Sequence, residues 1–274
     1  MSNLDEKTVA SFGDEWLRFD QSGMIEAEAL KAFEEYFAVF PWAALPSHAV
    51  GFDMGCGSGR WARFVALRVG RLHCLDPSAA IEVARRNLVE FENVEFHRAS
   101  LETTILPPCS QDFGYSLGVL HHVPDTASAI HSCVALLKPG APLLLYLYYA
   151  FDNRPAWFRV LWRVSDLGRR LICQLPARFK HVVTDVIAAL VYWPLAKLSR
   201  LMELLRIPVR SMPLSFYRHH TFYTMRTDSR DRFGTPLEQR FTRVQIESMM
   251  REAGLVDIHF SDLAPFWCVV GTKA

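Results

Sequence analysis

Three glycines between two carboxylates are the residues of this sequence whose types and spacing most clearly point to chemistry. The glycines lie in the block Gly55–Gly59, after the apolar run 49–54 and before a helical pattern, so they predict a strand–turn–helix junction. Such a loop lets a ligand lie against bare backbone, and the helix N-terminus adds unpaired N–H groups. Asp53 precedes the loop, and Asp76 ends the next apolar run about 20 residues further on.

The two carboxylates narrow the class of ligand. A glycine loop taken alone would fit a nicotinamide or flavin nucleotide equally well. Asp53 would repel a pyrophosphate but suits a cationic amino group, and Asp76 is placed to accept hydrogen bonds from ribose hydroxyls. A nucleoside that carries an amino acid satisfies both acids at once, and S-adenosylmethionine is such a ligand.

Strands and helices must alternate to place these residues at one edge of a sheet. Short apolar runs alternate with helical patterns over about a hundred residues, and two closing strands follow a late helix at 241–253. The expected strands are 49–54, 71–76, 93–99, 112–119, 141–151, 255–262 and 265–273. The pattern predicts an α/β fold with a largely parallel sheet and helices on both faces.

Four blocks together carry a resemblance to a known family: DMGCGSG at 53–59, LDPS at 75–78, SLGVLHHVPD at 116–125 and LLKPG at 136–140. The sequence resembles the class I S-adenosylmethionine-dependent methyltransferases, in the group of small-molecule enzymes with a D-x-G-C-G-x-G loop and an L-H-H turn. The resemblance implies a Rossmann-like seven-stranded sheet whose last strand runs antiparallel between the fifth and sixth. It also implies S-adenosyl-L-methionine as the cofactor.

The resemblance assigns the cofactor contacts position by position. The loop residues line the methionine portion, Asp53 faces its amino group, Asp76 holds the ribose, and the two residues after Asp76 lie beside the adenine. Relatives often place an acid after the third strand. Here Ser100 is the expected equivalent, with Glu102 as the alternative. The expected set is Asp53, Gly55, Cys56, Gly57, Asp76, Pro77, Ser78, Ser100, Leu101, Leu117 and Gly118. Cys56, at a helix start, is interpreted as a packing residue rather than a reactive thiol.

The chain divides into four expected parts. Residues 1–45 form an N-terminal helical cap, 46–151 the cofactor-binding core, 152–212 a helical lid inserted after the fifth strand, and 213–274 an acceptor-side segment with the closing strands. The insertion is rich in Lys and Arg and is interrupted by prolines, and its aromatic residues are interpreted as lid core. A membrane-surface element and a subunit interface are the alternatives to a lid.

The acceptor site is expected among His, Tyr, Asp and Arg side chains near the strand ends. A hydroxyl acceptor needs a general base. Candidates come from the His pair of the turn after the fourth strand and from the segment after 213, which is rich in polar and aromatic residues. The candidates are His121, His122, Tyr217, His219, His220, Tyr223, Asp228 and Arg232. His219, His220, Asp228 and Asp231 include metal-ligand types without a diagnostic spacing, so no metal is predicted. The structural alternative is an ion-paired loop.

These residues predict O-methylation of a polar small molecule: a sugar, a sugar phosphate or a carboxylate-bearing metabolite. The alternatives are N- or S-methylation, a peripheral membrane enzyme that acts on a lipid-linked glycan, a Rossmann oxidoreductase and a non-catalytic binding module.

Composition limits the remaining classes. Lys+Arg 30 against Asp+Glu 29 disfavours a globally basic nucleic-acid binder, and six cysteines without a C-x-x-C pair disfavour a zinc ribbon or a disulfide scaffold. Residues 1–16 are polar and acidic, unlike a signal peptide, and the uncharged run 186–196 is shorter than a bilayer span. We therefore expect a cytoplasmic protein with a small-molecule partner, without a prediction of its oligomeric state.

Overall fold

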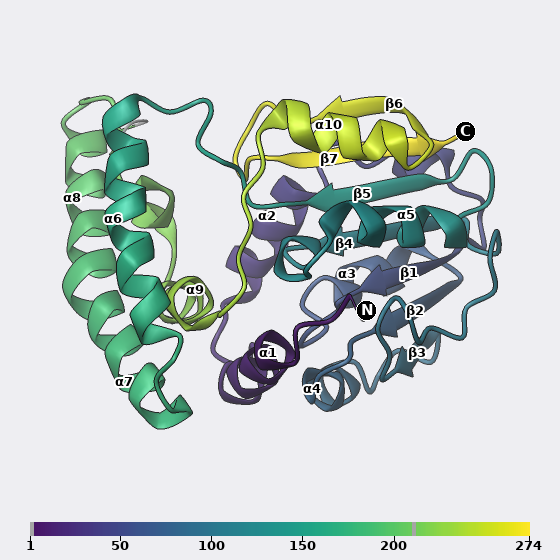
Figure 1. Ribbon diagram of the computed structural model, residues 1–274, viewed down its shortest axis with the longest axis horizontal. Helices are drawn as coiled ribbons and strands as arrows, with labels where there is room; N and C mark the ends of the chain where they lie inside the picture. The colour runs from purple at the N-terminus through teal and green to yellow at the C-terminus, as the bar shows by residue number, and fades with distance from the viewer. Residues whose placement is uncertain (1–2, 210–211) are drawn as a thin grey trace. The chain divides into compact units, whose positions relative to one another are not determined.

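Seven strands form one sheet in the order β3-β2-β1-β4-β5-β7-β6 (Figure 1). The strands are β1 (Val50–Met54), β2 (Arg71–Leu75), β3 (Val94–His97), β4 (Phe113–Leu117), β5 (Pro142–Tyr146), β6 (Leu255–Phe260) and β7 (Cys268–Lys273). The first five pair in parallel, and β7 runs antiparallel to both β5 and β6. This confirms the predicted α/β fold and the predicted position of the reversed last strand.

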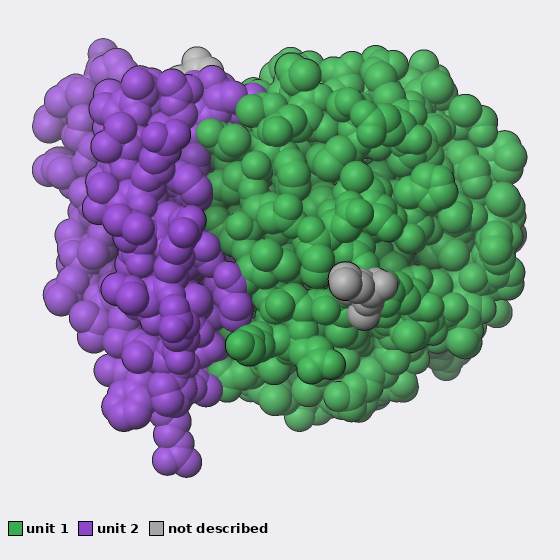
Figure 2. Space-filling view, viewed as in Figure 1, with its two compact units in different colours: residues 1–20, 29–150, 237–274 green, residues 21–28, 151–236 purple. Residues whose placement is uncertain are grey.

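The computed structural model describes residues 3–209 and 212–274, and these divide into two compact units (Figure 2). Unit 1 contains residues 1–20, 29–150 and 237–274, and unit 2 contains residues 21–28 and 151–236. Residues 210 and 211, in the expected lid segment, lie outside the described residues. Unit 2 ends at Pro236, so it takes in the stretch 213–236 that the sequence grouped with the closing strands.

Helices cover both faces of the sheet in unit 1. They are α1 (Glu6–Arg18), α2 (Glu26–Tyr36, whose first residues belong to unit 2), α3 (Ala62–Val65), α4 (Ala80–Asn87), α5 (Thr126–Leu136) and α10 (Arg243–Glu252), with short 3-10 turns at Trp42–Ala44, Ala66–Arg68 and Leu120–His122. Side-chain oxygens of Asp5, Asp125 and Thr242 accept backbone N–H groups and so fix the first turns of α1, α5 and α10.

Side-chain alternation along the strands separates two apolar layers. On one face, Phe52 and Leu143 join the core formed with α5 and α10. On the other, the Phe37 ring meets Tyr115 at 5.2 Å and the Phe40 ring meets Phe113 at 6.0 Å. Because both layers are filled, β1 and β4 are buried on both faces, as the central strands of a doubly covered parallel sheet must be.

Unit 2 is helical. Its elements are α6 (Ala156–Ile172), α7 (Ala177–Ile187), a π-helical turn η4 (Ala188–Tyr192), α8 (Trp193–Leu204), a 3-10 turn η5 (Ser215–His219) and α9 (Phe222–Gly234). The helices α6, α7 and η4 all contact α9. Pro194 does not end the helix, because η4 shifts the hydrogen-bond register just before the proline. The elements α7, η4 and α8 therefore form one helix, Ala177–Leu204.

Candidate active site

The glycine loop lies at the carboxyl end of β1 and is fastened to β2. The backbone N–H groups of Gly55 and Cys56 donate to the Leu75 carbonyl oxygen at 2.7 and 3.0 Å, and that of Gly57 donates to Asp76 Oδ2 at 2.9 Å. The loop turns at Gly55, Gly57 and Gly59, which have φ of +79°, +54° and +78°. Glycine adopts this left-handed conformation without a Cβ clash, so the loop's shape depends on these residues.

Asp53 is a buried acid whose Oδ2 has no hydrogen-bond partner among the described residues. Burial raises the pKa of Asp53 to about 8, against a smaller opposing effect of the adjacent Tyr115 hydroxyl, and Asp76 adds to the rise. A buried acceptor without a donor is costly, and a ligand ammonium group would both pair with it and restore its charge. Asp53 and the glycine loop therefore fit the amino-acid end of S-adenosylmethionine.

A pH dependence of stability follows from Asp53. The pKa of Asp53 is raised from 3.8 to about 8. Between pH 3.8 and about pH 8, the folded state therefore keeps a proton on Asp53 that the unfolded chain has lost. The stability that this proton contributes is complete at low pH and is lost as pH rises towards about 8. The Tm of Asp53→Asn relative to the wild type, both without cofactor, should therefore increase from pH 5 to pH 8 and stay level above about pH 9. A constant difference in calorimetric scans over the whole range would contradict the raised pKa.

Asp76 holds the loop as well as facing the expected ribose position. Its Oδ1 accepts from the Ser78 N–H at 2.8 Å and from the Ser78 hydroxyl at 2.6 Å. Burial raises the pKa of Asp76, against the opposing hydrogen bonds from Ser78 and Gly57. Each carboxylate oxygen can accept more than one hydrogen bond, so these contacts leave acceptor capacity. The role of Asp76 towards ribose remains a prediction.

The other expected cofactor contacts follow the strand ends. Pro77 and Ser78 follow β2, and Ser100 and Leu101 follow β3. Leu117 is the last residue of β4, and Gly118 follows it. The Ser100 N–H donates to Thr103 Oγ1 at 2.9 Å, so Ser100 belongs to a local turn. These residues share the carboxyl edge of the parallel strands with the glycine loop, which is where ligands bind in such sheets. Their individual contacts remain predictions.

Cys56 is buried, and its thiol contacts that of Cys74. The hydrogen bond with Cys74, burial and the nearby carboxyl groups raise the pKa of the Cys56 thiol well above its usual range. A thiol held protonated is a poor nucleophile. The structure therefore favours the packing role.

His121 and His122 follow β4 as a buried 3-10 turn whose hydrogen bonds define their tautomers. His122 Nδ1 lies 2.6 Å from the Leu237 carbonyl oxygen, which can only accept, so Nδ1 carries a proton and Nε2 holds the lone pair of the neutral ring. The Tyr148 N–H lies 3.4 Å from His121 Nδ1, which assigns the His121 proton to Nε2. Burial, His122 and Arg240 hold the pKa of His121 well below its usual range, so His121 is neutral. Of the pair, His122 has the tautomer of a general base.

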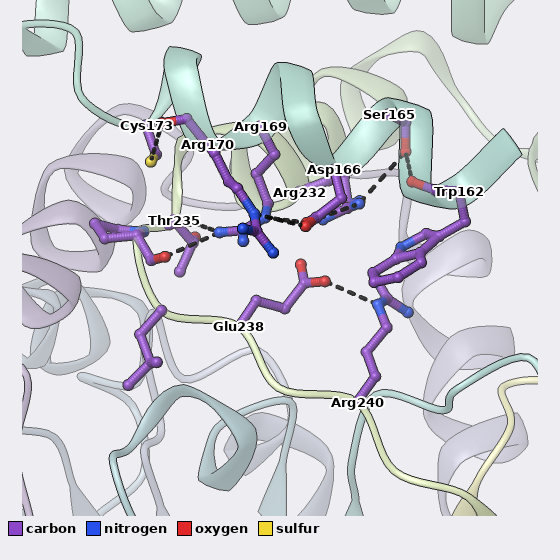
Figure 3. Close-up of polar contacts among 12 residues, drawn as sticks. Trp162, Ser165, Asp166, Arg169, Arg170, Cys173, Arg232, Thr235, Glu238 and Arg240 are labelled. Carbon is purple, nitrogen blue, oxygen red and sulfur yellow. Dashed lines mark hydrogen bonds and ion pairs between the residues drawn. The ribbon is translucent and has the colours of Figure 1, made fainter. Parts of the chain in front are cut away.

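A strap of backbone, residues 237–241 of unit 1, holds this turn. The Gln239 N–H donates to the His121 carbonyl at 2.9 Å, and the Phe241 N–H donates to the Tyr148 carbonyl at 2.9 Å. Arg240 lies over the Tyr148 ring at 4.9 Å and pairs with Glu238 at 2.8 Å (Figure 3). The strap thus fixes the His turn and the exit from β5 together, a role that sequence interpretation missed because backbone carbonyls leave no mark in a sequence.

A row of aromatic rings joins the glycine loop to the His turn. Successive ring centroids lie 4.6 Å apart for Trp61–Tyr36, 5.0 Å for Tyr36–Tyr146, 5.8 Å for Tyr146–Tyr148 and 3.9 Å for Tyr148–His121. The tyrosines are only partly buried. Sequence interpretation did not single out these rings; their only signal was the aromatic density of the run 146–149 at the end of β5.

The six other candidate acceptor-side residues belong to unit 2 and have partners within it. Tyr217 donates to Asp228 at 2.8 Å, His219 pairs with Glu203 at 2.8 Å, and the Tyr223 hydroxyl accepts from the Gln21 N–H at 3.0 Å. His220 Nδ1 meets the Phe216 carbonyl at 3.0 Å, and Arg232 lies 3.7 Å from Asp166 (Figure 3). These contacts favour the ion-paired alternative for the segment, and a catalytic role of any of the six stays a prediction.

Metal-ligating residue types come together elsewhere in the described ranges. His73, Glu95 and His97 lie on β2 and β3 with ligand atoms within 4.8 Å of one another. Glu95 also pairs with Arg71 at 3.1 Å, so an arginine already compensates its charge. His219, His220 and Asp228 have the separate partners given above.

The sheet order with β7 reversed is the one that the sequence resemblance implied, and the glycine loop and the His turn lie at the ends of the expected strands. The chain has the fold of the class I S-adenosylmethionine-dependent methyltransferases.

Comparisons with known proteins agree with this class. Residues 52–145 match the family described as "Methyltransferase domain". Among curated relatives, a ubiquinone biosynthesis O-methyltransferase of Alkalilimnicola ehrlichii is 38% identical over 96 residues, which are 34% of this chain and 38% of that protein. That of Pectobacterium carotovorum is 28% identical over 158 residues, 52% of this chain and 58% of that protein. The chain thus spans less than two thirds of these relatives' own length.

The fold of human N-acetylserotonin methyltransferase, solved in complex with S-adenosylmethionine, is similar at a TM-score of 0.55. The two chains are 16% identical, and the match covers 96% of this chain and 56% of the human one. At that identity the likeness concerns the fold alone.

Proposed function

We propose that this protein transfers the methyl group of S-adenosylmethionine to a hydroxyl oxygen of an aromatic small molecule. The observation that carries the proposal is the His122 tautomer, in which Nδ1 donates to the Leu237 carbonyl, so that Nε2 is the nitrogen that accepts a proton in the neutral ring. The cofactor supplies a methyl group on a sulfonium, which is transferred by in-line displacement. Within this chain, Asp53 holds the cationic amino group, the glycine loop positions the methionine portion and His122 accepts the hydroxyl proton.

Two observations favour an aromatic acceptor over the sugar, sugar phosphate or carboxylate expected from the sequence. The partly buried rings of Tyr36, Tyr146 and Tyr148 provide flat apolar surface beside the His turn. The arginines that suggested an anionic acceptor have carboxylate partners: Arg218 with Glu203, Arg226 with Asp185, Arg232 with Asp166 and Arg240 with Glu238. Relatives named for ubiquinone biosynthesis are consistent with a ring that carries hydroxyl groups.

The test is turnover with methyl-labelled S-adenosylmethionine against three acceptor types: a substituted catechol, a hexose phosphate and an aliphatic carboxylic acid. We expect the label on a catechol oxygen, identified by mass spectrometry, and no product from the other two. Label on the hexose phosphate or the carboxylate would overturn the aromatic acceptor. Tight binding of NADH without binding of S-adenosylmethionine would overturn the proposed reaction itself.

A further inference from the structure

Two helices of unit 2, α6 and the helix Ala177–Leu204, expose most of their large apolar side chains. A helix on the surface of a globular protein normally turns its apolar stripe inward and its charges outward. On α6 the apolar residues follow helical spacing and are exposed, Leu171 to 71%. The exposed set is Trp157, Val160, Leu161, Val164, Leu167 and Leu171. The opposite face of α6 buries Asp166 and Arg169.

The long helix Ala177–Leu204 has the same reversal. It exposes large apolar side chains along its length, Leu190 to 72% and Leu204 to 74%. Its buried positions are Lys180, Thr184, Ala188, Tyr192, Ala196 and Ser199; half of them are polar, and Tyr192 and Ala196 pack in a small apolar cluster with Met225. The exposed set is Phe179, Val182, Val186, Leu190, Val191, Trp193, Leu198, Leu201 and Leu204. The helix is long and apolar enough to cross a bilayer, and only 28% of its most apolar window is buried. It is therefore not the core helix of its unit.

The inward faces are occupied by polar contacts within the unit. On α6, Asp166 accepts from Arg169 at 2.6 Å and pairs with Arg232 of α9 at 3.7 Å (Figure 3). On the long helix, Asp185 takes both guanidinium contacts of Arg226 at 2.9 Å. These bonds fix which side of each helix faces α9, so the apolar sides cannot turn inward without breaking charged pairs.

The positive charge of unit 2 indicates which kind of partner would cover the exposed apolar sides of α6 and the long helix. Residues 152–209 contain ten Lys and Arg and four acids, although the whole chain has a net charge of only +1. Arg159, Arg163, Arg178, Lys197 and Arg200 are exposed on the same helices as the apolar stripes. Apolar side chains with Trp and flanking cations are the composition of helices that lie in the interface of an anionic bilayer. A protein partner would require no such excess of positive charge.

We propose that unit 2 is a membrane-docking unit, with α6 and the long helix lying in the headgroup region of an anionic bilayer. The long helix docks on the surface rather than crossing the bilayer, because α9 covers one side of it with charged residues such as Arg226 and Asp228. A crossing helix would place those charges in hydrocarbon, which is expensive. This proposal does not depend on which acceptor the methyltransferase site takes.

The test is flotation of the full chain, without detergent, on vesicles of phosphatidylcholine alone or with about 30% phosphatidylglycerol. We expect it to float with the anionic vesicles at least tenfold more than with the neutral ones, and less at high salt. Leu167→Glu, Leu171→Glu, Val182→Glu and Val186→Glu combined should abolish flotation. Val89→Glu with Val244→Glu is the control, because those unit 1 residues are 83% and 76% exposed and should not matter. Circular dichroism melts establish that each variant is folded.

The depth of docking in the bilayer can be measured from the fluorescence of Trp157 and Trp193. These residues are 50% and 47% exposed on the apolar sides of the two helices. Brominated lipids should quench their fluorescence, more strongly with bromine near the headgroup than near the bilayer centre, and Trp157→Phe with Trp193→Phe should remove that quenching. Flotation of the four-Glu variant equal to the wild type would overturn the proposal. Resistance to carbonate extraction would show a crossing helix instead. A vesicle-free dimer that the four substitutions dissociate would show that a second copy covers these faces.

Discussion

Gly57→Val is expected to weaken S-adenosylmethionine binding at least about 100-fold, or about 2.7 kcal/mol, while leaving the fold intact. Gly57 has φ of +54°, and a Cβ built there meets Trp16 Nε1 at 3.0 Å. The space beside its backbone is where the methionine portion of the cofactor is expected. A branched side chain would therefore both strain the loop and fill that space.

Gly140→Val is the control that separates the effect of backbone strain from the effect of filling the cofactor site. Gly140 has φ of +80°, and nothing lies within 4 Å of the added Cβ. This control carries the strain of a left-handed position in open space, away from the glycine loop. In titration calorimetry it should bind the cofactor as the wild type does, while its Tm falls. If Gly57→Val binds normally, or if both variants lose affinity equally, the loop does not bind the cofactor in the way proposed here.

The sheet and the cofactor loop could be predicted from the sequence because each local signal agreed with the others. Strand runs ended in the acids Asp53 and Asp76, and the glycines between the first strand and its helix allowed only a tight turn. In the structure the ends of β1 and β2 lie together, because the N–H of Gly57, after β1, donates to the carboxylate of Asp76, after β2. A parallel sheet brings such strand ends together whatever the loops elsewhere do.

Unit 2 could not be predicted in the same way. Helical spacing of apolar residues shows that a face exists but not that it points inward. Trp157, Phe179 and Trp193 were interpreted as lid core, and this was wrong: all three are exposed. The bonds that decide the orientation, such as Arg226 to Asp185, join residues far apart in the chain. Pro194 likewise predicted an interruption that the π turn before it prevents.

His122 illustrates the limit within the site itself. The sequence offered two adjacent histidines with no means of assigning their roles. The structure separates them, because the Leu237 carbonyl sets the tautomer of His122, while His121 stacks on Tyr148 at 3.9 Å and receives that residue's N–H. The determining atoms are backbone atoms, and residue 237 is separated from 122 by more than a hundred positions.

His122→Ala is expected to lower kcat for a catechol acceptor by about 10²–10⁴-fold, the usual contribution of a general base. Cofactor affinity should change less than about threefold, because the Asp53 carboxyl and the glycine loop are untouched. Added imidazole should restore part of the rate, since the substitution leaves room for a ring that can accept the same proton. Loss of structure alone would not respond to imidazole in this way.

The matched control is His131→Ala, which removes an exposed histidine of α5 in the same unit. Its kcat and its cofactor affinity should equal those of the wild type. Single-turnover measurements with methyl-labelled cofactor and a substituted catechol separate the chemical step from product release. If His122→Ala turns over at the wild-type rate, the proton leaves by another route, and the unit 2 candidates His219 and His220 become the next residues to test. If the rate falls but imidazole restores none of it, His122 acts by positioning the turn against the strap 237–241 and not by accepting the proton.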